Sequence, residues 1–185
     1  MLVALTNAQR EAPVDLQAME RLARCAVRRL EIRQRGRLAV TFVGSQAIRS
    51  VNQRFLRHNR ITDVITFRYD GRRKSRTGPR PEEIVGEILI APAEARRYAR
   101  THGVRYRQEL ARYVVHGLLH WLGHDDQTPT QQRQMRRRED RILMSCGVLT
   151  AGQGARDEGR ENSPQEMSRT PRPAGHARRG GHAPR

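Results

Sequence analysis

Two histidines spaced four residues apart are the feature of this chain best suited to metal chemistry. His116 and His120 lie among apolar residues in a stretch whose pattern is typical of a buried helix. On a helix this spacing places both imidazoles on one face, about one turn apart, where both can reach the same ion. Neutral imidazole suits Zn²⁺, with Zn–N distances of roughly 2.0–2.1 Å. The sequence therefore predicts a site for one zinc ion per chain.

A third ligand has to come from beyond the end of this helix. If the helix continued, His124 would lie about 12 Å along the axis from His116 at roughly 1.5 Å per residue, too far to share an ion. Gly123 removes this difficulty, because glycine can adopt the left-handed conformation that ends a helix and turns the chain back. The candidates for the third ligand are therefore His124, Asp125 and Asp126.

Hydrophobic periodicity predicts the elements that position this cluster. Helices are expected over 15–32, 45–56, 92–102, 105–122 and 129–146, and strands over 37–43, 62–69 and 84–91. The strand at 84–91 is apolar on both faces and is expected at the centre of its sheet. The fold class predicted is α+β, a small mixed sheet of three to four strands packed with about five helices, with the zinc site on the long helix.

Composition divides the chain into two parts near residue 150. From Ala151 onward there is no Val, Ile, Leu, Phe, Trp, Tyr or Cys. Such a segment buries too little apolar surface to offset the entropy lost on ordering. We expect one metal-binding domain over 1–150 and a disordered basic tail over 151–185.

The charge of the chain favours a polyanionic partner. The formal net charge is +17, and the tail holds seven arginines against four acidic residues, so +14 belongs to residues 1–150. A basic excess of this size favours RNA, DNA or an anionic membrane surface as the partner, and nucleic acid is the class we prefer.

No membrane partner is expected, because no stretch reaches the apolar length needed to cross a bilayer. The N-terminus lacks the charged start and long apolar run of a signal peptide, so the cytoplasm is the expected location. Cys25 and Cys146, the two cysteines, are expected as buried thiols.

The run from His116 to Asp126, HGLLHWLGHDD, resembles the signature of the YbeY family, bacterial rRNA maturation factors described as zinc-dependent single-strand endoribonucleases. Residues 62–67 (TDVITF), 86–88 (GEI) and Asn52 resemble further parts of the family pattern, over about 37–146. The family has a third His where this chain has Asp126. Carboxylate is also a zinc ligand, so Asp126 is the preferred third ligand and His124 the alternative.

The resemblance implies a single-strand-specific, metal-dependent endoribonuclease that acts in maturation of the 16S rRNA 3′ end and in ribosome quality control, on rRNA or ribosomal particles. Many family members have an Arg six residues before the Thr of the TDV strand, thought to matter for activity. This chain has Leu56 there, with Arg57 adjacent as a candidate substitute. Arg57, Arg60 and the Arg-rich segment 72–80 are candidates for holding RNA phosphates.

Catalytic groups beyond the metal are not defined by the sequence. Asp125 is a possible general base, although a structural cap is its more ordinary role.

One alternative function is that of a non-catalytic ribosome-assembly or RNA-binding protein. Its zinc would be structural and closed by four ligands, with both His124 and Asp126 bound. A metalloprotease is the other, but such peptidases place a Glu general base directly after the first His, where this chain has Gly117.

Overall fold

The computed structural model describes residues 1–69 and 82–150. Its strands are β1 (Leu2–Asn7), β2 (Arg37–Phe42), β3 (Val64–Arg68) and β4 (Ile84–Ile90), and its helices are α1 (Leu16–Arg29), α2 (Ser45–Val51), η1 (Asn52–Leu56), α3 (Pro92–His102), α4 (Tyr106–Trp121) and α5 (Pro129–Ser145). The predicted α+β class is confirmed. The Arg-rich segment 72–80 and the tail 151–185 lie outside the described residues.

The four described strands form one mixed sheet in the order β1-β2-β4-β3. β1 and β4 run parallel to β2, whereas β3 pairs with β4 in the antiparallel direction. The predicted central place of β4 is therefore confirmed. β1 is the strand that the pattern analysis did not assign, because a short apolar run at a sheet edge has little periodicity of its own.

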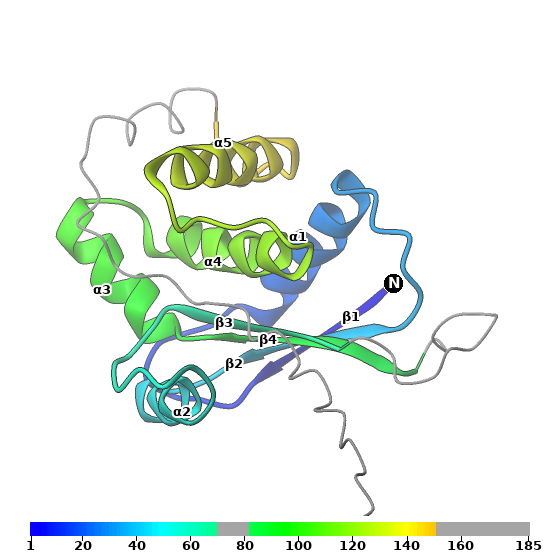
Figure 1. Cartoon of the computed structure of the whole chain (residues 1–185). Coiled ribbons are helices and arrows are strands. Elements are labelled where there is room, and N and C mark those ends of the chain that lie inside the picture. The colour runs from blue at the N-terminus through cyan, green and yellow to red at the C-terminus, as the bar shows by residue number, and fades with distance from the viewer. Residues whose placement is uncertain (70–81, 151–185) are drawn as a thin grey trace, which may run out of the picture.

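The helices cover the two faces of the sheet unequally (Figure 1). α1, α3 and α4 lie over one face, and α5 packs outside α4. On this side the large apolar core joins side chains of α1, α4 and α5 to those of the strands. α2 lies on the opposite face, over a smaller core around Ile48, Ile65 and Ala91.

α4 is the buried axis of the domain. Its residues from Glu109 to Trp121 are all buried, since the sheet lies on one side and α5 on the other. A helix that is apolar around most of its circumference is stable only in such surroundings. Polar groups on its inner turns, including His116 and His120, are therefore enclosed by protein rather than by solvent.

Gly117 lets α4 approach the sheet closely. A Cβ atom at this position would lie 2.5 Å from Cγ2 of Ile88 and 3.2 Å from Cγ1 of Val64. Any side chain here would push the helix away from β3 and β4. The position that holds a catalytic Glu in the metalloprotease pattern is thus a packing contact in this chain.

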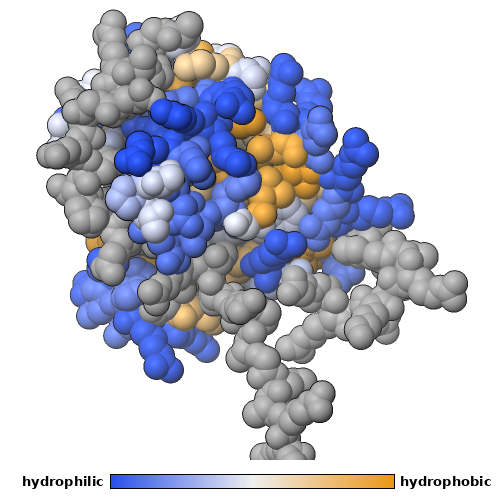
Figure 2. Space-filling model, turned by 45° about the horizontal axis from the view of Figure 1, so that its top comes forward, coloured by the Kyte–Doolittle hydropathy of each residue, from blue (hydrophilic) through white to orange (hydrophobic). Residues whose placement is uncertain are grey.

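The surface is mainly hydrophilic on the face shown in Figure 2, with an apolar area open among the polar residues. Within 1–69 and 82–150, none of the helices combines the length and apolar character that crossing a bilayer requires.

Cys25 and Cys146 form a disulfide, so the prediction of two buried thiols is wrong. Cys25 lies on α1 and Cys146 follows the last turn of α5, with their Cα atoms 5.9 Å apart. Their separation of 121 residues hides this pairing from any local pattern. It exists because α1 and α5 pack together in the tertiary structure.

We expect the oxidised protein to be more stable than the reduced protein by about 4–5 kcal/mol, the loop-entropy value for a closure of this length. Urea unfolding with and without dithiothreitol measures the difference, and thiol counting by mass spectrometry reports the redox state. Cys25→Ala serves as the control, because its stability should not respond to the reductant. Equal stability of the oxidised and reduced wild-type protein would contradict a constraining disulfide.

Candidate metal centre

The end of α4 has the hydrogen bonds of a Schellman motif. The N–H of His124 donates to the carbonyl of Leu119 at 3.0 Å, and the N–H of Gly123 donates to that of His120 at 2.9 Å. Gly123 has a φ of 92°, in the range that favours glycine. The predicted reversal at Gly123 is confirmed, and it carries Asp126 back towards the helix face from which the histidines project.

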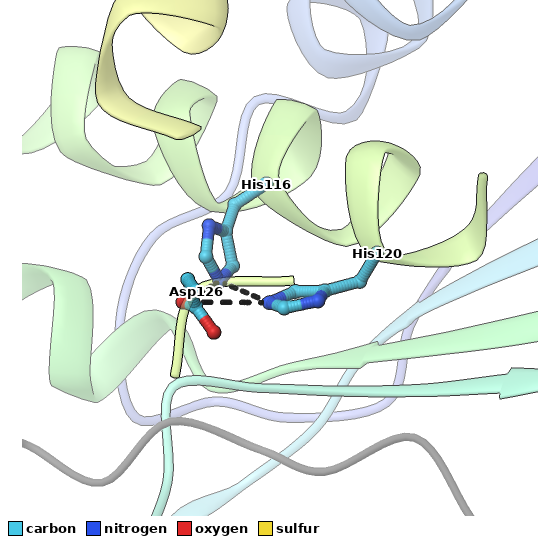
Figure 3. A group of neighbouring side chains, drawn as sticks. All are labelled: His116, His120 and Asp126. Atoms are coloured by element: carbon cyan, nitrogen blue, oxygen red, sulfur yellow. Dashed lines mark hydrogen bonds and ion pairs between the residues drawn. The ribbon is translucent and has the colours of Figure 1, made fainter. Parts of the chain in front are cut away.

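Three buried side chains meet at this reversal (Figure 3). The Nε2 atoms of His116 and His120 are 2.9 Å apart. Oδ2 of Asp126 lies 3.7 Å from the first nitrogen and 3.6 Å from the second. Each of the three residues is 2–3% exposed, so their polar atoms face one another in an enclosed space.

This arrangement fits a metal ion by two independent observations. Ligand atoms held tetrahedrally at roughly 2.0–2.1 Å from zinc lie about 3.3–3.4 Å from one another. The three separations among the ligand atoms of this cluster, 2.9 Å, 3.6 Å and 3.7 Å, lie on either side of that value. Among the described residues, Oδ2 of Asp126 is the buried side-chain oxygen or nitrogen that has no hydrogen-bond partner. Burial of an unpaired carboxylate oxygen is costly, and a cation between the three groups would satisfy it.

His124, the alternative third ligand, lies outside this cluster. It is partly exposed, and Nη1 of Arg138 lies 2.8 Å from its Nε2. Burial, the nearby Arg138 and His120 all lower the pKa of His124. Asp125 is exposed, and its Oδ1 accepts a hydrogen bond at 2.9 Å from the backbone N–H of Asp126. The N-cap of α5 is Thr128, so the cap expected at Asp125 lies three residues further on.

A buried carboxylate holds the far side of the His116 ring. Nδ1 of His116 lies 2.7 Å from Oε1 of Glu139 on α5, and Oε2 of Glu139 accepts from Nη1 of Arg112 at 3.0 Å. A carboxylate in this position fixes the tautomer and leaves Nε2 free to face an ion. The same arginine also binds Asp140 at 2.7 Å.

In the absence of a metal, His116 and Glu139 each stabilise the charged form of the other. Burial disfavours the charged imidazole, but the hydrogen bond and charge of Glu139 outweigh it and raise the pKa of His116 to about 9. Burial likewise disfavours the Glu139 carboxylate, yet its hydrogen bond to His116 and the nearby positive charges hold its pKa at about 2. A cation at Nε2 of His116 would therefore compete with the proton that Glu139 favours.

Glu139 and Arg112 were missed by the sequence analysis, although each carries a detectable signal. Glu139 follows Met135 by four residues and precedes Ile142 by three, which places it on the apolar face of its helix. Arg112 is a charged residue within the most apolar helix of the chain. In the sequence, Glu139 resembles an ordinary member of the charged run 136–141.

The candidate RNA-binding residues lie on a different segment. Arg57 and Arg60 are both exposed between η1 and β3, and Arg57 adopts the left-handed conformation with a φ of 59°. Neither belongs to the buried cluster. This segment leads into β3, which packs against α4 beside His116: Oγ1 of Thr66 donates to the carbonyl of Gly117 at 3.4 Å.

Comparisons with known proteins agree on one family. The model of the family described as endoribonuclease YbeY matches residues 4–147. The chain is 30% identical over 130 residues to the endoribonuclease YbeY of Staphylococcus saprophyticus, covering 70% of this chain and 85% of that protein. It is 32% identical over 145 residues to that of Chlamydia abortus, covering 76% and 88%.

Two further comparisons cover different parts of the similar proteins, one by sequence and one by structure. The chain is 35% identical over 112 residues to the endoribonuclease YbeY of Myxococcus xanthus, covering 60% of this chain but only 37% of that longer protein. The solution structure of TM1509 from Thermotoga maritima is similar with a TM-score of 0.55 at 21% identity, over 86% of this chain and 100% of that one. The structural likeness shows a shared fold.

Proposed function

Because the chain belongs to the endoribonuclease YbeY family, we propose that it is a zinc-dependent, single-strand-specific endoribonuclease that acts in maturation of the 16S rRNA 3′ end and in ribosome quality control. Family membership supports a nuclease role in RNA processing. The finer parts of the proposal, namely zinc, the rRNA or ribosomal-particle substrate and a cytoplasmic location, rest on the resemblance and on the chemistry of the site.

The observation that carries the proposal is the buried group of His116, His120 and Asp126, which could hold a metal ion. We propose these three side chains as the zinc ligands. Zinc, when bound, polarises a phosphoryl oxygen and lowers the pKa of water. His116 and His120 present their Nε2 atoms, Glu139 keeps the His116 ring in the orientation this requires, and Asp126 offsets part of the positive charge.

Three ligands support a catalytic site over a structural one. Structural zinc is closed by four protein ligands, whereas catalytic zinc keeps a position for water or substrate. In the described part of the chain the group that could hold a metal has three members, and His124 lies beside Arg138 instead. We propose that Arg57 and Arg60, exposed on the segment leading to β3, contribute to holding RNA phosphates.

The proposed cytoplasmic location can be tested through the disulfide between Cys25 and Cys146. Disulfides are rare in the reducing cytosol. The thiol count of Cys25 and Cys146 in protein taken directly from cells, with thiols blocked at lysis, therefore bears on the cytoplasmic location as well as on stability.

The proposal is tested by cleavage of a single-stranded RNA with the zinc-loaded protein and with His116→Ala. We expect wild-type protein to cleave the single strand in preference to a duplex of the same length. Loss of a metal ligand should reduce the rate by more than the roughly 10- to 100-fold reported for outer-shell partners, while RNA affinity stays near wild type. No cleavage by zinc-loaded wild-type protein, or unchanged cleavage by His116→Ala, would overturn a zinc nuclease at this site.

A further inference from the structure

An aromatic ring lies exposed on the segment between α2 and β3. Phe55 is 52% exposed, an unusual state for a phenylalanine in a folded domain. Its ring contacts Phe67 of β3 edge-on, with centroids 5.4 Å apart and an interplanar angle of 73°. The contact places the ring at a defined position on the surface without covering it.

The backbone around this ring is held in one conformation by a buried residue. Asn52 is 3% exposed, and its Nδ2 donates to the carbonyl of Arg60 at 2.9 Å. The backbone carbonyl of Asn52 accepts the N–H of Arg57, which closes the π-helical turn η1. π-Helical turns and left-handed non-glycine residues such as Arg57 occur frequently at functional sites.

The charge of the segment is uniformly positive. Residues 44–62 hold Arg49, Arg54, Arg57 and Arg60 and contain no Asp or Glu. The guanidinium carbon of Arg54 lies 5.6 Å from the centroid of the Phe55 ring, and Arg54 and Arg57 are both exposed. An exposed aromatic ring among arginines is the combination with which proteins bind single-stranded nucleic acid.

The segment ends beside the metal centre. It leads into β3, and a side chain at Gly117, next to His116, would contact Val64 at the start of that strand. Phe67, which the ring contacts, packs with Ile65 on the α2 face of the sheet, whereas the metal centre lies on the α4 face. Because β3 is an edge strand, a strand of RNA on the segment would reach the buried cluster around this edge of the sheet. Arg60 and Ile61, which is 41% exposed, lie on the surface between η1 and β3.

We propose that Phe55 is a stacking platform for an unpaired RNA base, with Arg54 and Arg57 binding the adjacent phosphates; this rests on RNA being the substrate. A ring stacks on the face of any base, so the platform is tolerant of sequence. It requires a base that is free of its own neighbours, so it selects single strands over duplexes. The choice of substrate is then made outside the metal centre, before hydrolysis.

The test compares Phe55→Leu and Phe55→Tyr in the zinc-loaded full chain. Leucine keeps apolar contact with Phe67 but has no ring, whereas tyrosine keeps the ring. Binding is measured by fluorescence anisotropy with a short phosphorothioate-linked RNA that resists cleavage. We expect Phe55→Leu to weaken single-strand binding about tenfold, the size of one base–aromatic stack, and Phe55→Tyr to bind within about twofold of wild type.

Duplex RNA separates stacking from a loss of charge or shape. Both variants should bind a duplex as wild type does, since its bases are already stacked. Wild-type affinity of Phe55→Leu for the single strand, or an equal loss for strand and duplex, would overturn the platform.

A second measurement does not depend on the folding of any variant. The fluorescence of 2-aminopurine in a single-stranded RNA should change when wild-type protein binds, because the base leaves its neighbours and stacks on the ring, and unchanged fluorescence of the bound RNA would also overturn the proposal. Neither readout involves cleavage. Selective single-strand binding without metal-dependent cleavage would support the platform while refuting the nuclease proposal.

Discussion

Asp126→Asn should abolish zinc binding and yet leave the metal-free protein at least as stable as wild type. In wild type, Oδ2 of Asp126 is buried without a hydrogen-bond partner, and its attraction to His116 at 3.7 Å offsets only part of that cost. Because His116 keeps Glu139 as a partner in the variant, removing the charge of Asp126 should not destabilise the metal-free protein. With zinc present, wild type gains stability from a ligand that binds only the folded state, and the variant does not. The order of stability of the two proteins should therefore reverse when zinc is added.

Metal content by mass spectrometry and thermal melting with zinc or EDTA measure these effects on untagged protein. We expect about one zinc per wild-type chain and a loss of affinity in the variant larger than the roughly 10- to 100-fold cost of an outer-shell partner. His124→Ala is the matched control from the same segment, and it should keep its metal. Zinc retained by Asp126→Asn and lost by His124→Ala would instead identify His124 as the third ligand.

Much of the fold follows from local patterns that the tertiary structure does not override. The apolar repeat along α4 and the two-faced apolar strand β4 were predicted because each is buried on opposite sides, and burial of that kind determines residue type along the whole element. The reversal at Gly123 was predicted because glycine is the residue that adopts a positive φ readily. The convergence of His116, His120 and Asp126 follows from these two features together.

Other parts of the structure depend on contacts between distant segments. The disulfide requires α1 to lie beside the end of α5, and no local pattern records that pairing. Helix 45–56 was expected as one regular element, but its end is the π-helical turn η1, which is stabilised by the hydrogen bond from Asn52 to Arg60. Glu139 supports His116 only because α5 folds back over α4.

Glu139→Gln should weaken zinc binding while the cluster itself remains intact. The side chain keeps its size, but its negative charge no longer fixes the His116 ring or favours its basic form. The affinity for zinc should fall by about 10- to 100-fold, as found for outer-shell carboxylates. Glu139→Ala should in addition destabilise the fold, by less than the roughly 3–5 kcal/mol of a buried charge left without any partner, because Arg112 keeps Asp140 and Glu109.

Asp140→Asn is the control that separates orientation of the histidine from stability of the network. Asp140 binds the same Nη1 of Arg112 at 2.7 Å, and no contact joins it to His116 among the described residues. This variant should lose some stability and keep its zinc affinity within about twofold. Competition with a fluorescent zinc chelator measures affinity, and urea unfolding measures stability. Equal zinc affinities of Glu139→Gln and Asp140→Asn would show that Glu139 has only a structural role.

The pH dependence of the metal-free protein provides an independent readout of the same pair. The pKa of Glu139 is lowered from 4.5 to about 2 by its hydrogen bond to His116 and by nearby positive charges, against the effect of burial. A carboxylate whose pKa is lower in the folded state stabilises the protein above its unfolded pKa, and this contribution is lost as the pH falls. We therefore expect wild-type stability to decline between about pH 4.5 and pH 2, and Glu139→Gln should flatten this part of the profile. The same decline in both proteins would assign the acid sensitivity to other carboxylates, whereas a flattened profile together with weakened zinc binding would show that one buried charge supports both the fold and the metal centre.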